Sequence, residues 1–158
     1  EQASVDNALG EVKSSIMLTG DRASAWLAWA VMCEARGRFE EAVQAYELAM
    51  RVEPQTTGPR TNLAALLEQM AAQTAPETRD SISERVNRLR AEELPLLGRD
   101  AGLAPNNAAV QYRYGLALYL ANRLNEAMAQ LERAVELEPE TPDFRQARDL
   151  LKAKLSEQ

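Results

Sequence analysis

Histidine is absent from this chain of 158 residues, and cysteine occurs once, as Cys33. The absence of histidine excludes, within this chain, a Ser/His or Cys/His nucleophilic pair, an imidazole metal site and a CxxCH haem attachment. A single cysteine cannot form a disulfide inside the chain, so cysteine usage leaves the cellular compartment open. We therefore assign neither a metal ion nor another cofactor.

Strand-favouring residues are also scarce. Aromatic residues make up 5% of the chain, and valine, isoleucine and threonine never alternate with polar residues over a useful length. Apolar residues make up 46%, mostly alanine and leucine, and this predicts an all-helical fold. No run approaches the roughly 20 apolar residues that a membrane-spanning helix needs, so we expect no membrane partner.

Basic residues are not gathered into a patch. The formal net charge is −6, and lysine and arginine are interspersed with acids. Binding to a phosphate backbone requires clustered cations, so we expect no nucleic-acid partner. The chain begins Glu-Gln-Ala-Ser, which is neither a signal peptide nor an initiator methionine. We therefore expect a piece of a longer protein, and its targeting cannot be read from this piece.

Residues 23–56 indicate two amphipathic helices joined by a turn at Gly37. Small residues are expected to let the two helix backbones approach, while large ones fill the flanking space. These positions are Trp26, Trp29, Ala30 and Cys33 in the first helix and Ala42, Tyr46 and Ala49 in the second, and Pro54 closes the unit. The pattern recurs with a period of 34 residues, which indicates a repeat array.

A second copy lies at residues 108–141, where Asn122 replaces Gly37 at the turn. Asparagine is the usual second choice for a left-handed backbone. The equivalent positions are Tyr114, Gly115 and Leu118, then Ala127, Leu131 and Ala134, followed by Pro139. Gln111 departs from the pattern, because Trp26 stands at its equivalent. Both copies resemble the tetratricopeptide repeat, which implies an all-α solenoid of antiparallel helix pairs wound into a right-handed superhelix.

We interpret residues 1–158 as one domain of this kind. Residues 1–20 match a second helix, so they are a half repeat or leading helix, whose open apolar edge would allow self-association. Residues 57–107 are a divergent repeat with a 17-residue insertion near 73–90, and Pro95 is expected to kink or restart its second helix. The insertion is either a tolerated surface extension or a ledge that covers part of the groove or another chain. Residues 142–157 have the apolar stripe of a capping helix, with Thr141 as its N-cap.

Neighbouring carboxylates are the remaining candidates for catalysis. The acids at positions 40–41, 92–93 and 136–140 are expected on exposed faces or at helix ends. Without a cleft that separates their pKa values, they lack the environment of an acid–base pair. Cys33 falls at an inward position, which favours a buried apolar role over a reactive thiol. We therefore predict that the chain is not an enzyme.

In tetratricopeptide repeat proteins the first helices line a concave groove that binds peptides. The resemblance therefore implies a scaffold module with a protein or peptide partner. The groove residues expected here are Leu27, Val31, Glu34, Thr61, Asn62, Ala65, Glu68, Gln69, Tyr112, Arg113, Leu116 and Tyr119. Tyr112 and Tyr119 would anchor an amphipathic helix or a hydrophobic peptide. These side chains could instead pack between neighbouring first helices or against the insertion.

Some members of this family hold a C-terminal carboxylate with a clamp of lysine, asparagine and arginine. Asn62 and Arg113 match that clamp, but Leu27, Val31 and Ala109 stand in place of two lysines and an asparagine. We therefore predict no binding of heat-shock chaperone tails.

A weaker resemblance concerns the setting of the chain. Residues 21–67 and 107–139 are similar to the repeat tails of bacterial multihaem cytochrome c proteins. This likeness implies, as an alternative, an accessory C-terminal domain that docks or oligomerises a larger enzyme. Bacterial cytoplasm and periplasm both stay open as the compartment. CxxCH motifs before Glu1 would favour this alternative, and further 34-residue units there would favour the scaffold.

Overall fold

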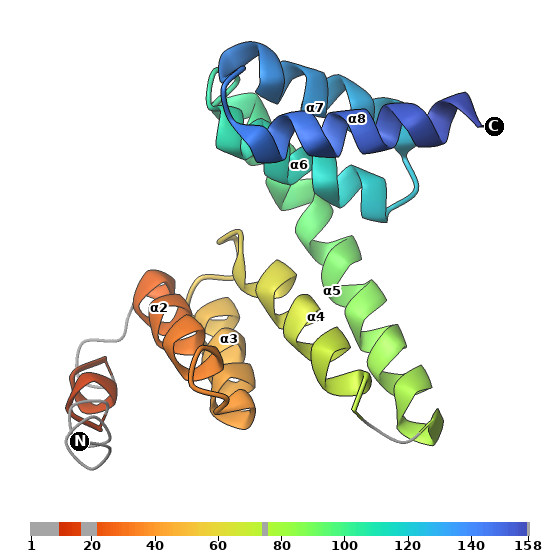
Figure 1. The fold of residues 1–158 in the computed structure, drawn as a ribbon. Helices are drawn as coiled ribbons and strands as arrows, with labels where there is room; N and C mark the ends of the chain where they lie inside the picture. Colours follow the sequence, from red (N-terminus) through yellow and green to blue (C-terminus); the bar gives the residue numbers. More distant parts are fainter. Residues whose placement is uncertain (1–9, 17–21, 74–75, 158) are drawn as a thin grey trace. The chain divides into compact units, whose positions relative to one another are not determined.

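The computed structural model describes residues 10–16, 22–73 and 76–157. Within these ranges every regular element is a helix, which confirms the predicted all-α fold. Residues 10–16 are helical, and seven further helices follow (Figure 1): α2 Ala23–Glu34, α3 Phe39–Val52, α4 Pro59–Ala71, α5 Pro76–Leu103, α6 Ala108–Leu120, α7 Leu124–Leu137 and α8 Pro142–Ser156. None of the helices described here is long and apolar enough to cross a membrane.

The chain forms two compact units, and the boundary between them lies inside α5. Unit 1 is Glu1–Leu89 and contains α2, α3, α4 and the first half of α5. Unit 2 is Arg90–Gln158 and contains the rest of α5 with α6, α7 and α8. The expectation of one domain over residues 1–158 does not distinguish these units, because a copy of the same repeat pattern occurs in each of them.

Close packing of α2 against α3 forms the core of unit 1. Ala30 and Ala42 are both 0% exposed, and Trp29 and Tyr46 are buried in the same cluster. Short side chains let the helix backbones approach, and the large rings then exclude water from the space beside them. Burying one such large apolar side chain contributes roughly 1.5–3 kcal/mol. The predicted division between small and large positions is confirmed in this unit.

The turns that follow α2 and α6 have the same geometry. Gly37 has a φ of 72° and Asn122 a φ of 57°, so both adopt the predicted left-handed conformation. In each case the next residue's amide donates to the carbonyl five residues back, at 2.9 Å. These bonds satisfy carbonyls at the helix end that lack an intrahelical donor.

The second helix of the middle repeat is unusually long. α5 has 28 residues, twice the 14 residues of α3 and of α7. Most of the extra length of this repeat is therefore helical, because α4 ends at Ala71 and α5 begins at Pro76. Pro95 removes one backbone donor, but α5 continues through it. The predicted alternative of a helix restart at Pro95 is wrong.

Glu93 is buried, so the prediction that the acids at positions 92–93 lie on an exposed face is wrong for Glu93. Its side chain is 1% exposed, whereas Glu92 is exposed. Leu89 and Leu97, four residues before and after it, are buried on the same face of α5. Glu93 continues this apolar spacing, so its position in the sequence indicates burial. The prediction of an exposed side chain rested on its charge instead.

In unit 2, α6 packs on α7 through small residues, as predicted. Ala127 and Ala134 are 0% exposed. A Cβ at Gly115 would lie 3.0 Å from the Leu131 Cγ and 3.3 Å from the Gln130 Cβ. Glycine at this position therefore allows the two helices to approach more closely than a larger residue would.

Gln111 replaces a large apolar residue because it caps the end of α5. Its side chain is 4% exposed, and Nε2 donates to the backbone oxygens of Ala101 at 3.1 Å and Ala104 at 3.3 Å. Carbonyls at a helix end have no intrahelical donor. The buried carboxamide thus satisfies them, and it is itself hydrogen-bonded, which a buried polar group requires.

α8 has the predicted properties of a capping helix. Phe144 and Leu151 are buried, and the helix packs on α7. Thr141 occupies the N-cap position, but its hydroxyl donates to the Glu138 carboxylate at 3.2 Å and makes no side-chain bond to the first turn of α8. Asp143 lies in that first turn, where negative charge is favourable.

The half repeat predicted at residues 1–20 is described only over residues 10–16. There Ile16 packs against the apolar cluster of unit 1, and Lys13 pairs with Glu41 at 3.4 Å. Residues 1–9 and 17–20 lie outside the described ranges. Self-association through this edge therefore stays a prediction.

Candidate functional site

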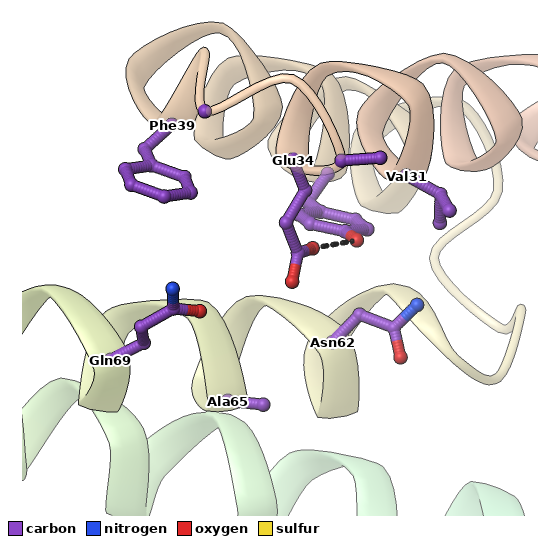
Figure 2. Close-up of a pocket in the computed structure, with 9 residues that line it drawn as sticks. Val31, Glu34, Phe39, Asn62, Ala65 and Gln69 are labelled. Atoms are coloured by element: carbon purple, nitrogen blue, oxygen red, sulfur yellow. Dashed lines mark hydrogen bonds between the residues drawn. The ribbon is translucent and has the colours of Figure 1, made fainter.

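A pocket of about 530 Å³ lies between α2 and α4 in unit 1 (Figure 2). We refer to it as the unit 1 pocket. Its volume falls within the range of typical ligand sites. The residues that line it come from α2, the following turn, α3 and α4: Val31, Glu34, Ala35, Gly37, Phe39, Tyr46, Asn62, Ala65 and Gln69. Because α2 and α4 are the first helices of consecutive repeats, the pocket lies where the groove was predicted.

A hydrogen bond orients Glu34 in this pocket. The Tyr46 hydroxyl donates to Glu34 Oε2 at 2.8 Å, and Tyr46 is 0% exposed. Burial, together with the neighbouring Glu34 carboxylate, raises the pKa of Tyr46, and a hydrogen bond with Asn62 opposes this rise. Tyr46 therefore stays a neutral donor. In Figure 2 the second carboxylate oxygen of Glu34 points into the space between α2 and α4.

Two carboxamides on α4 form the opposite wall. Asn62 and Gln69 are seven residues apart, which corresponds to about 10 Å along the helix axis. Ala65 lies between them and is exposed, so its short side chain leaves this wall open (Figure 2). Each carboxamide offers both a donor and an acceptor, which are the groups that a peptide backbone needs.

Apolar side chains complete the lining. Val31 is 47% exposed, and Phe39 is partly buried against the core of unit 1. The pocket thus combines one carboxylate, one phenol and two carboxamides with apolar surface. This combination suits the binding of a peptide, in which apolar contact supplies area and a few polar groups fix the orientation.

Five of the eight groove residues predicted in unit 1 line this pocket: Val31, Glu34, Asn62, Ala65 and Gln69. The other three, Leu27, Thr61 and Glu68, are not part of the lining. Leu27 is partly buried against the core, and its Cδ2 lies 3.7 Å from the place of a Cβ on Gly58. Phe39 and Tyr46 line the pocket although sequence reasoning did not assign them to it. Tyr46 was interpreted only as a packing residue, and the turn at Gly37 placed Phe39 beside the groove.

In unit 2, α8 contacts both tyrosines that were expected to anchor a partner. The rings of Tyr112 and Phe144 lie with their centroids 4.6 Å apart. Burial, followed by the charge of Asp143, raises the pKa of Tyr112. The Lys154 Nζ lies 4.7 Å from the ring centroid of Tyr119 and 3.3 Å from its hydroxyl. The Tyr112 ring is therefore partly covered by α8, whereas Tyr119 has a lysine beside it and remains 37% exposed.

The other two predicted residues of α6 differ in their burial. Leu116 is partly buried in an apolar cluster with Leu118 and Leu151, and Arg113 is exposed. Since the tyrosines contact α8 and Leu116 packs inward, the unit 1 pocket is the better candidate site.

Cys33 and Glu41, two of the candidate catalytic groups, have surroundings that indicate a role in the fold. Cys33 is 1% exposed, and burial raises the pKa of its thiol, in agreement with an apolar role. Glu41 accepts hydrogen bonds from Arg38 at 2.7 Å and Lys13 at 3.4 Å. Among the residues that the structure describes, no group of three or more cysteine, aspartate and glutamate side chains could hold a metal ion.

Two segments of the chain match sequence models of the tetratricopeptide repeat, at residues 23–66 and 108–141. They contain the two helix pairs α2–α3 and α6–α7, whose small residues and turns were described above. No curated protein sequence matches the chain.

Solved structures share the fold. MamA (41-end) from Desulfovibrio magneticus RS-1 has a TM-score of 0.64 at 17% identity, over 98% of this chain and 78% of that one. The first TPR domain of Spaghetti (RPAP3), bound to the HSP90 peptide SRMEEVD, has a TM-score of 0.56 at 18% identity, over 85% and 94%. The Sgt2 TPR domain from Aspergillus fumigatus has a TM-score of 0.55 at 15% identity, over 85% and 80%. At these identities the likeness concerns the fold alone.

Proposed function

Because this chain belongs to the tetratricopeptide repeat family, we propose that it is a non-catalytic interaction module that binds a peptide segment of a partner protein in the unit 1 pocket. Burial of the large apolar side chains and small inter-helix residues builds a rigid pair of helices. The next first helix, α4, adds a second wall, so the pocket is available without a large rearrangement.

One observation carries this proposal. Five residues that the repeat pattern assigns to the groove line a single pocket, and they include its carboxylate and both carboxamides. A solved structure of the same fold, the Spaghetti (RPAP3) domain, holds a peptide. This supports a peptide as the kind of partner, and it says nothing about the sequence of that peptide.

The test is to fill the pocket and measure peptide capture. A random-peptide phage library is panned against the immobilised full chain, its Ala65→Trp variant and an Ala28→Trp control. Both alanines are exposed on helices of unit 1, but only Ala65 lines the pocket. We expect the wild type and Ala28→Trp to recover the same peptides, and Ala65→Trp to recover at least about tenfold fewer, since an indole occupies the binding space.

Circular dichroism shows whether both variants remain helical and melt at the wild-type temperature. If the Ala65→Trp variant recovers the same peptides as the wild type, the pocket is not the binding surface. The alternative role, an accessory domain of a larger enzyme, stays a prediction that CxxCH motifs next to Glu1 would favour.

A further inference from the structure

We infer that the peptide held in the unit 1 pocket carries a lysine or arginine side chain, which the Glu34 carboxylate binds. This inference rests on the proposed function and names the chemistry of its partner. Three features of the pocket support it: its charge, the orientation of its carboxylate and the spacing of its carboxamides.

The charge of the lining is negative. Glu34 is the one charged residue among those that line the pocket. The two arginines of the adjacent turn are engaged elsewhere, because Arg38 pairs with Glu41 at 2.6 Å and Arg36 donates to the Met32 carbonyl at 3.4 Å. A cation that enters the pocket therefore meets a carboxylate that neither arginine neutralises.

The carboxylate is oriented before a ligand arrives. Tyr46 donates to Oε2 of Glu34, so the rotation of this side chain is restricted. The other oxygen points into the pocket (Figure 2). A carboxylate can accept several hydrogen bonds, and Tyr46 uses one. A bond from a lysine or arginine to the remaining oxygen would be charge-assisted, which is stronger than a bond between neutral groups.

The carboxamides fit an extended backbone. About 10 Å separate Asn62 and Gln69 along α4, and an extended chain rises about 3.3 Å per residue. Some three residues of a peptide therefore span the two groups, with Ala65 below them. A long basic side chain from this segment would cross to Glu34, with its methylene groups against the apolar part of the lining.

An acidic peptide fits this pocket poorly. A carboxylate there would face Glu34, and no lysine or arginine is among the lining residues to compensate. The Spaghetti (RPAP3) structure holds an HSP90 peptide with the acidic end SRMEEVD. The two pockets would thus differ in ligand charge although the folds are alike.

The first experiment compares two variants that remove the same charge. The random-peptide phage library is panned against the full chain, its Glu34→Gln variant and a Glu40→Gln control. Glu40 is exposed on α3 and outside the pocket. We expect lysine and arginine to be enriched next to apolar residues on the wild type and on Glu40→Gln. On Glu34→Gln this enrichment is lost, because glutamine keeps the shape but carries no charge.

The second experiment measures affinity by fluorescence anisotropy with one selected peptide and its lysine-to-norleucine analogue. Glu34→Gln should weaken binding of the basic peptide about tenfold to a hundredfold, as for a hydrogen bond between charged groups. Glu40→Gln should weaken it less than about threefold, since its charge is exposed and screened. The norleucine analogue should bind the wild type and Glu34→Gln equally, because the interaction is already absent.

Three outcomes would overturn the inference. Selected peptides without basic enrichment, or with acidic enrichment, would contradict it, and so would equal affinity of the basic peptide for wild type and Glu34→Gln. If such peptides are still lost on Ala65→Trp, the proposed function stands and only the inference fails. If the wild type selects no peptides, or if Ala65→Trp keeps them, both fail.

Discussion

Replacing Ala127 by leucine tests whether small residues are needed for the close packing of α6 on α7. Ala127 is 0% exposed and belongs to a buried cluster with Leu118, Leu131 and Leu151. If a cavity could receive the three added carbon atoms, each would contribute about 0.8 kcal/mol of stability. Ala127 has no exposed surface, and the α6–α7 contact one turn along the helix is tight, because a Cβ on Gly115 would lie 3.0 Å from Leu131. The helices must therefore separate, which costs roughly 1–3 kcal/mol.

The measurement is urea unfolding followed by circular dichroism, with thermal melting as a second probe. For a chain of 158 residues, a loss of 1–3 kcal/mol lowers the melting temperature by about 2–12 °C. The control is Ala129→Leu, which adds the same atoms to an exposed position of α7 and should change stability by less than about 0.5 kcal/mol. Equal stability of the two variants would refute the packing of α6 on α7 through Ala127.

Three further predictions concern burial and charge. Cys33 is 1% exposed, and burial raises the pKa of its thiol. A thiol reagent at pH 8 should therefore label the folded chain at least about tenfold more slowly than the urea-unfolded chain. Equal labelling rates would place Cys33 at the surface. Burial alone would raise the pKa of Glu41, but hydrogen bonds from Arg38 and other neighbours outweigh it and lower the pKa. Since a lowered carboxyl pKa stabilises the fold above the unfolded pKa of about 4.3, this contribution is lost as the pH falls through the folded value. In Glu41→Gln, the free energy of unfolding should therefore fall less steeply as the pH is lowered, by less than about 1 kcal/mol in total. The same pH dependence in the variant and the wild type would contradict the pairing of Glu41 with Arg38. Tyr112→Ala removes the ring contact with Phe144 and should cost roughly 1–3 kcal/mol in urea unfolding, whereas a variant as stable as the wild type would show that α8 does not pack on this ring.

Local features of the fold were predictable because they depend on residues close in sequence. A left-handed residue is needed wherever a helix ends in a tight turn, so Gly37 and Asn122 could be recognised from their type and position. Small residues at helical spacing identify the contact between paired helices, as Ala42 and Ala127 show. Five of the groove residues assigned by the repeat spacing line the unit 1 pocket, and their role in binding stays a prediction.

Two other features, the burial of Gln111 and of Glu93, depended on contacts between helices that the repeat pattern does not predict. Gln111 is buried because it satisfies carbonyls at the end of α5, and its own position in the repeat predicts an apolar residue. Glu93 is buried by its place on the inner face of α5, although its charge suggested exposure. In both cases the partner elements, and not the residue type, decided the environment.

The sequence by itself determined the helical class, the pairing of neighbouring helices and the turns between them, since 34-residue spacing and residue size encode these short-range contacts. Only the tertiary structure decided which of the predicted groove side chains remain open to a binding partner. Tyr119 occupies the repeat position of Glu34, 85 residues later in the chain, but Lys154 of α8 contacts Tyr119, whereas Glu34 lines an open pocket. The reason is physical: periodicity shows which residues share a face of a helix, and packing across the chain determines what covers that face.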